Sequence, residues 1–266
     1  MDKAVYNNVL EKHFFLSSKG QEGVYQEITL EYLCQSNQAT LFLEQYSKQI
    51  KALKPQVPAT YFFSMFGITC SGFLAMLILH QVVVPLSLST VSAQLYKIEK
   101  YQSKAIAFKV SSEDWQEGDG TVEWRRKQIS SFFTLTVTPL LDSIAKLVDI
   151  RPRELWGQLL HGFEYGWKVA LNLAANEEER ESLNQDFQWI TKEASHVLFN
   201  SLKNRLDFPH IKIENPTTPG LMQRLKPTCC LYYQTEGAKA KCYTCPRMTV
   251  NEREKRKKEI IAEVTQ

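Results

Sequence analysis

Nineteen consecutive residues, Tyr61 to Leu79, carry no charge, and this stretch limits what the chain can fold into. Its length is near the minimum of about 17–20 residues for a membrane span. However, the stretch contains the polar or small residues Ser64, Gly67 and Thr69, and no basic cluster flanks it. We therefore predict a buried core helix here, and a membrane anchor stays open as the alternative.

Apolar residues recur at helical spacing in further parts of the chain and predict helices over 24–53, 139–148, 152–167 and 178–205. Proline at the second position of Thr138-Pro139 and of Arg151-Pro152 is typical of a helix start. Residues 86–111 are richer in Val, Ile, Ser, Thr and Tyr, which favours two or three strands. The pattern predicts an α+β fold that is predominantly helical.

Three parts of the chain differ in composition. Residues 1–205 predict a mainly helical N-terminal domain, with the strands around 86–111. Residues 206–228 contain four prolines and a glycine, which is typical of a connector, and we expect 206–250 to form a small cysteine-bearing segment packed on the helical domain. Residues 251–266 mix basic and acidic side chains and predict a charged C-terminal helix or tail.

The positive charge is concentrated near the C-terminus. Residues 1–205 hold 21 Lys+Arg against 22 Asp+Glu, whereas residues 206–266 hold 11 against 7. The acidic residues of the tail blunt its basic run, so no nucleic-acid partner is expected. No secretory signal is visible at the N-terminus, and a reducing cytoplasmic setting is the expectation.

Four of the six cysteines fall within 17 positions, as Cys229, Cys230, Cys242 and Cys245. In a reducing setting such a group is more often a metal site than a disulfide framework. Neighbouring side chains of an extended backbone point to opposite faces, so adjacent cysteines converge only if the backbone is distorted. Most structural zinc sites avoid this with two spaced pairs. An iron–sulfur cluster, structural zinc, a Cys229–Cys230 disulfide and a Cys242–Cys245 redox pair all stay open on the residues alone.

The cysteine pattern, Cys-Cys followed by Cys-x-x-Cys-Pro near the C-terminus, resembles that of the FhuF-like ferric-siderophore reductases. Weaker similarity extends upstream through 61–96 and the block LLDSIAKLVDIRPRELWGQLL, so that it covers about 40–250. Eleven residues separate Cys230 from Cys242, where the family usually has ten. A loop containing Gly237 is expected to absorb the extra residue.

The resemblance implies a two-iron, two-sulfide (2Fe-2S) cluster on Cys229, Cys230, Cys242 and Cys245. It implies one-electron reduction of iron(III) in a ferric siderophore, which loosens the hold of hard oxygen ligands and releases iron(II) inside the cell. Because no dinucleotide or Walker motif is present, a separate electron donor protein or reductant is expected. Nearby basic residues are expected to favour the reduced cluster or attract an anionic substrate; they are Arg224, Lys226, Lys239, Lys241 and Arg247.

Two functions from other classes remain open. One is an iron–sulfur or redox sensor, and the other is a zinc-stabilised interaction protein. The expected location is cytoplasmic, with peripheral contact at the cytoplasmic face of the inner membrane as a further option. No catalytic residue beyond the cluster is expected, because electron transfer needs closeness and a suitable potential rather than a nucleophile or a general base.

Overall fold

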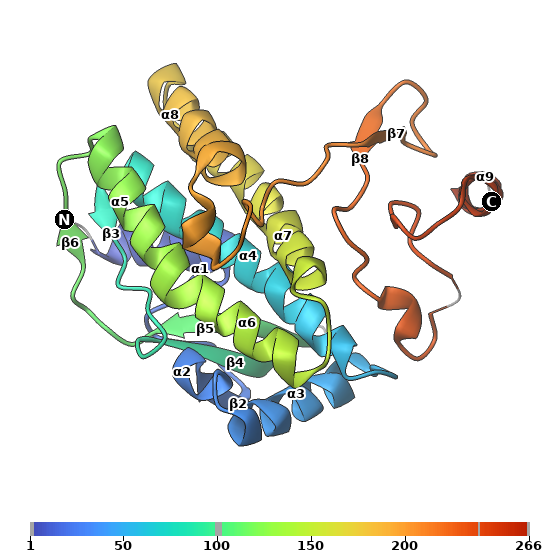
Figure 1. The fold of residues 1–266 in the computed structure, drawn as a ribbon, viewed down its shortest axis with the longest axis horizontal. Helices are drawn as coiled ribbons and strands as arrows, with labels where there is room; N and C mark the ends of the chain where they lie inside the picture. The colour runs from blue at the N-terminus through green and yellow to red at the C-terminus, as the bar shows by residue number, and fades with distance from the viewer. Residues whose placement is uncertain (1–2, 99–102, 239, 265–266) are drawn as a thin grey trace.

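A computed structural model describes residues 3–98, 103–238 and 240–264 of the chain. The predicted α+β, predominantly helical class is confirmed. In Figure 1 most of the helices form one body, and the C-terminal part, coloured orange to red and ending in a helix of its own, lies beside it.

The N-terminal part combines helices with a four-stranded sheet whose order is β1-β5-β4-β2. The pairs β2–β4 and β4–β5 are antiparallel, whereas β1 runs parallel to β5. The elements are α1 (Lys3–Phe14), β1 (Leu16–Ser17), β2 (Val24–Thr29), α2 (Leu30–Leu33), α3 (Ser36–Ile50), α4 (Gln56–Leu79), β3 (Val82–Val83), β4 (Val91–Ile98), β5 (Ser103–Val110) and β6 (Gln116–Glu117). The segment 86–111, where strands were predicted, thus contains β4 and β5.

The remaining elements are mostly helical. They are α5 (Val122–Phe132), the π-helical turn η2 (Phe133–Val137), α6 (Thr138–Leu147), α7 (Pro152–Leu173), α8 (Glu177–Gln188), the π-helical turn η3 (Trp189–Glu193), the 3₁₀ turn η4 (His196–Phe199), β7 (Lys212–Glu214), β8 (Met222–Arg224), the 3₁₀ turn η5 (Tyr232–Gln234) and α9 (Val250–Val264). β3 pairs with β6 and β7 with β8, both antiparallel. The predicted start of a helix at Arg151-Pro152 is confirmed by α7.

The uncharged stretch lies in α4, at the centre of the protein. One side of α4 packs on the sheet, where the rings of Phe62 and Phe66 lie 5.5 and 5.2 Å from that of Phe108 on β5. α4 is long and apolar enough to cross a membrane, but 83% of its most apolar 18-residue window is buried inside the protein. It is therefore the core helix that the sequence predicts.

The other side of α4 packs on α7, and glycines bring the two backbones together. A Cβ atom on Gly162 would lie 1.7 Å from the carbonyl oxygen of Ser64, and one on Gly67 would lie 2.1 Å from that of Leu159. Each glycine lacks a side chain where it meets the backbone of the other helix. The two helix axes therefore approach more closely than bulkier residues would allow. Helices α4 and α7 thus form one rigid platform, and the cysteine segment contacts it at Thr60 and Gln158.

Two predictions about helix boundaries are wrong. Residues 24–29 form strand β2, which pairs with β4, so the predicted helix over 24–53 is restricted to α2 and α3. The predicted helix start at Thr138-Pro139 is confirmed, since α6 begins at Thr138, although α5 leads into it through η2 without a break. The π-helical turn accommodates Pro139, which lacks an N–H and would clash within regular α-helix. The predicted helix over 178–205 ends early, with η3 at Trp189–Glu193.

Candidate functional site

The cysteine segment is fixed by backbone hydrogen bonds to the short connection between α3 and α4. Ala52 and Thr235 form an isolated antiparallel bridge. The N–H of Leu53 donates to the carbonyl of Gln234 at 2.8 Å, and that of Glu236 donates to the carbonyl of Lys51 at 2.9 Å. A loop that carries little regular structure of its own is thereby held on the connection that leads into α4.

The adjacent cysteines are followed by the backbone distortion that the sequence requires. Leu231 adopts a left-handed conformation, with φ 58° and ψ 18°, which is uncommon for a residue with a branched side chain. This turn lets the N–H of Leu231 donate to Sγ of Cys229 at 3.4 Å. The chain therefore reverses immediately after Cys230, so both cysteines can serve one site.

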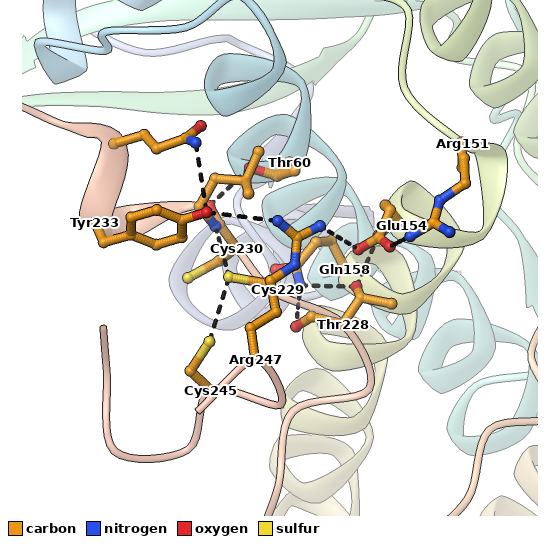
Figure 2. Close-up of polar contacts among 12 residues, drawn as sticks. Thr60, Arg151, Glu154, Gln158, Thr228, Cys229, Cys230, Tyr233, Cys245 and Arg247 are labelled. Carbon is orange, nitrogen blue, oxygen red and sulfur yellow. Dashed lines mark hydrogen bonds and ion pairs between the residues drawn. The ribbon is translucent and has the colours of Figure 1, made fainter. Parts of the chain in front are cut away.

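The four thiols are linked by contacts that run from Cys229 through Cys245 and Cys242 to Cys230, and we call this set the thiol row. Sγ of Cys245 donates to Sγ of Cys229 at 3.4 Å, as Figure 2 shows. The side chain of Cys242 interacts with that of Cys245 and with that of Cys230. Within the described residues, no three His, Cys, Asp or Glu side chains converge as ligands of a single metal ion.

Hydrogen bonds between the thiols shift the pKa values of the four cysteines in different directions. The hydrogen bond from Cys245 lowers the pKa of Cys229. The same contact raises the pKa of Cys245, and the contact with Cys242, together with burial, raises the pKa of Cys230. All four are free thiols with no disulfide among them, and such thiols lose their protons when they bind a metal.

The two ends of the row have different surroundings. Cys229 and Cys245 are buried in a small apolar cluster with Leu231 and with Val57 of α4. Cys230 and Cys242 are only half-buried. Val57 belongs to the first turn of α4, whose N-terminal end carries partial positive charge and favours an anionic group.

A buried hydrogen-bond network attaches the segment to α7. Nε2 of Gln158 donates to the carbonyl and the hydroxyl of Thr228 at 2.8 and 3.1 Å, and that hydroxyl donates to the carbonyl of Glu154 at 2.8 Å (Figure 2). Gly157 leaves the space that Thr228 occupies, because a Cβ there would lie 2.4 Å from Cγ2 of Thr228. The residue before the first cysteine is thus held tightly on the helix.

Two residues of α4 and one of the segment lie beside Cys230. The hydroxyl of Thr60 donates to the carbonyl of Cys230 at 2.9 Å. Nζ of Lys226 donates to Sγ of Cys230 at 3.6 Å. Burial and then the nearby Cys230 raise the pKa of Tyr61, so its hydroxyl keeps its proton next to the sulfurs.

The five basic residues predicted around the cysteines do not have equal roles. Arg224 forms an ion pair with Glu164, Lys241 pairs with Glu252 at 2.9 Å, and Arg247 pairs with Glu154 at 3.5 Å. Lys239 lies outside the described residues. Lys226 contacts a cysteine directly and has no acidic partner in the part of the chain that the structure describes.

The spacing of the thiols matters for what they can hold. A tetrahedral metal ion with bonds of about 2.3 Å to sulfur holds two thiolates about 3.8 Å apart, and the 3.4 Å between Cys229 and Cys245 is close to this value. A row with one pair at each end suits two metal ions better than one.

Residues 228–247 match the FhuF 2Fe-2S C-terminal domain. No curated protein matches the chain.

The matched FhuF domain contains all four clustered cysteines, so the predicted family resemblance and the predicted 2Fe-2S cofactor are confirmed. The residues fit such a cluster, because four thiolates are its ordinary ligands. Lys226 and the N-terminal end of α4 would offset the negative charge. The FhuF match covers residues 228–247 and does not extend into the helical part of the chain.

Sequence reasoning missed the residues that position this FhuF-type segment, namely Thr60, Tyr61, Glu154, Gln158 and Thr228. Their partners lie far away in the sequence, with 170 positions between Thr60 and Cys230 and 70 between Gln158 and Thr228. One signal was present, because the Leu155-Trp156-Gly157 block belongs to the upstream similarity. Its glycine is the residue that admits Thr228.

His161 of α7 lies near the segment and is expected to make the protein sensitive to acid. Burial, and then the positive charges of Lys226 and Arg224, lower its pKa from 6.5 to about 4. Below pH 6.5 the unfolded chain therefore binds a proton that the folded protein refuses, and the free energy of unfolding falls by up to about 3 kcal/mol by pH 4.

His161→Gln is expected to remove this part of the pH dependence, as measured by urea denaturation at several pH values between 7 and 4. The exposed His196 is the matched control, and His196→Gln should retain the wild-type dependence. An unchanged slope in His161→Gln would contradict the assignment.

Proposed function

We propose that this chain is a ferric-siderophore reductase that works in the cytoplasm. The observation that carries the proposal is the row of four free thiols in a segment that matches a 2Fe-2S domain, with one end of the row half-buried. Electron transfer through such a site requires no general base and no nucleophile.

A bound 2Fe-2S cluster supplies one electron at a time. Siderophore-bound iron(III) accepts that electron and becomes iron(II), with no covalent bond formed and no proton transferred. A separate electron donor protein, such as a reduced flavoprotein or ferredoxin, returns one electron per turnover. The chain's own residues hold the thiolates, through Gln158, Thr228 and Thr60, and surround half of them with apolar side chains.

The first experiment combines composition with single-turnover kinetics. Anaerobically prepared protein is expected to contain about two iron and two sulfide per chain and to give an EPR signal after dithionite. Mixing the reduced protein with a ferric siderophore should oxidise the protein and release iron(II), which a ferrous chelator captures. Peripheral membrane contact would be detected by fractionation at low and high salt.

Cys245→Ala is expected to lose the cluster and the reaction, because it removes a buried ligand. Cys34→Ala is the matched control, since Cys34 is a half-buried thiol outside the cysteine segment, and it should retain both. Colourless wild-type protein that contains zinc without sulfide would overturn the proposal in favour of a structural site. A cluster that is present but does not reduce any ferric siderophore would instead favour a redox sensor.

A further inference from the structure

Helix α9 begins at the end of the cysteine segment and lies outside the part of the chain that matches the FhuF domain, which ends at residue 247. In Figure 1 it stands apart from the other helices, beside the loops of the C-terminal part. None of the side chains that the structure describes in α9 is buried, so burial of apolar groups contributes little to its placement. Its polar side chains supply the contacts instead.

One guanidinium of α9 holds the backbone around the last cysteine. Nη1 of Arg253 donates to the carbonyl of Tyr243. Its Nη2 donates to the carbonyl of Cys245 at 3.0 Å and to that of Met248 at 3.5 Å. The guanidinium carbon also lies 5.8 Å from the ring centroid of Tyr243, which is within the range of a cation–π contact. A single side chain thus collects three carbonyls on both sides of a cluster ligand.

The backbone of the Cys242-x-x-Cys245 turn uses its own N–H groups and leaves its carbonyls to α9. The N–H of Cys245 donates to the carbonyl of Cys242 at 2.8 Å, and the N–H of Met248 donates to the carbonyl of Cys245 at 3.2 Å. Arg253 adds the donors that the outer carbonyls need. Arginine suits this position because its guanidinium presents five N–H groups in a fixed planar fork, whereas the ammonium of lysine is a single point.

Further contacts hold α9 where its guanidinium reaches this turn. Its N-terminus is a capping box, in which the N–H of Glu252 donates to the hydroxyl of Thr249 at 3.2 Å and the N–H of Thr249 donates to the carboxylate of Glu252 at 2.7 Å. The same carboxylate pairs with Lys241 of the cysteine segment at 2.9 Å. One turn after the guanidinium, Lys257 pairs with Glu214 of β7 at 2.6 Å. Each exposed contact is weak alone, but together they fix the first two turns of the helix.

We propose that Arg253 is a positioning residue for the 2Fe-2S cluster, which fixes the Cys242–Cys245 turn through three carbonyls and whose positive charge favours the reduced cluster. Lys241, Arg256 and Lys257 have acidic partners, whereas Arg253 forms no ion pair within the described residues, so its charge is not neutralised there. Contacts that orient ligands in this way are worth about 10–100-fold in metal affinity. The inference goes beyond the proposed function, because it holds for any substrate that the cluster reduces.

The test measures two quantities on the cluster-loaded protein, namely the rate at which EDTA removes iron and the equilibrium constant for reduction, from a redox titration followed by EPR. Arg253→Gln removes both the fork and the charge. We expect iron release about tenfold faster and a reduction constant about fivefold smaller. Arg253→Lys keeps the charge but presents its donors from one nitrogen. It should release iron nearly as fast as Arg253→Gln and keep a reduction constant within about twofold of the wild type, a split that a merely structural contact would not produce.

Arg256→Gln is the matched control, because it makes the same chemical change on the same helix and its guanidinium pairs with Glu259 and Glu263 instead. Both quantities should stay within about twofold of the wild type. Hydrogen exchange followed by mass spectrometry on metal-free protein covers the case in which Arg253→Gln retains no cluster. The amides of residues 242–248 are then expected to exchange about fivefold faster than in metal-free wild type or Arg256→Gln, while the amides of α4 and α7 exchange as before.

The outcomes separate this inference from the proposed function. If Arg253→Gln releases iron, titrates and exchanges its amides as Arg256→Gln does, the role of Arg253 is overturned and the reductase proposal is untouched. If Arg253→Lys has the same lowered reduction constant as Arg253→Gln, the effect of the charge is overturned. If the wild type shows the expected pattern but does not reduce any ferric siderophore, the proposed function fails and the role of Arg253 stands.

Discussion

Gly162→Ala is expected to lower the free energy of unfolding by about 3–5 kcal/mol, a large share of the ordinary stability of a domain. Its Cβ would lie 1.7 Å from the carbonyl oxygen of Ser64, which is backbone and has no rotamer to change. Relief requires α4 and α7 to separate, and that opens the centre of the core. For a protein of this size the melting temperature should fall by about 10 °C.

The expected change in the free energy of unfolding has the opposite sign to that predicted by helix propensity. Helix propensity alone predicts that alanine stabilises α7 relative to glycine, by up to about 1 kcal/mol. Gly67→Ala should be nearly as destabilising, with its Cβ 2.1 Å from the carbonyl oxygen of Leu159. Gly166→Ala is the milder comparison, since its nearest neighbour is the side chain of Ser71 at 2.6 Å. Thermal and urea denaturation followed by circular dichroism would give the order, and a stabilised Gly162→Ala would show that the helices do not pack this closely.

Gly157→Ala is expected to remove the cluster and leave the helical core folded. Its Cβ would lie 2.4 Å from Cγ2 and 2.5 Å from Oγ1 of Thr228. Thr228 cannot turn away without loss, because it is buried and hydrogen bonds hold its hydroxyl on Glu154 and Gln158. Displacing it breaks two buried hydrogen bonds, each worth about 1 kcal/mol or more, next to Cys229.

The measurement is iron and sulfide per chain together with the EPR spectrum of the reduced protein. We expect cluster content to fall severalfold in Gly157→Ala while the thermal transition of the helical core moves little. Thr228→Ala in the same chain removes both clashing atoms, so the double variant should recover part of the cluster despite its lost hydrogen bonds. Full cluster occupancy in Gly157→Ala alone would contradict the role of Gly157.

Structural elements were predictable from the sequence where neighbouring residues determine them, and were not where contacts with distant residues do. Pro152 at the first position of α7 is a local signal, and the uncharged stretch of α4 needs burial in any fold, so both were predictable. β2 was not, because its residues alternate between exposed and half-buried and gain their strand conformation by pairing with β4, about 70 positions away. Pro139 marks the start of α6 as predicted, but the π-helical turn before it, which joins α5 to α6, has no local sequence signal.

The site shows the same division. The four cysteines form a local motif, and their spacing already required a distorted backbone, which the structure has at Leu231. Which basic residue acts on the thiols was not predictable, because the ion pairs of Arg224 and Arg247 involve Glu164 and Glu154 on α7. The position of the segment depends on contacts with Thr60 of α4 and Gln158 of α7, and no short sequence pattern encodes such contacts.

All four sulfurs come from one stretch of 17 residues, and this affects whether the protein stays folded without its cluster when iron is scarce. Closing so short a loop costs little chain entropy, and no helix of the core contributes a ligand. Loss of the cofactor therefore removes few of the contacts that hold the helices together. We expect an emptied chain to remain folded on its α4–α7 platform and to be reloaded, rather than degraded and synthesised again.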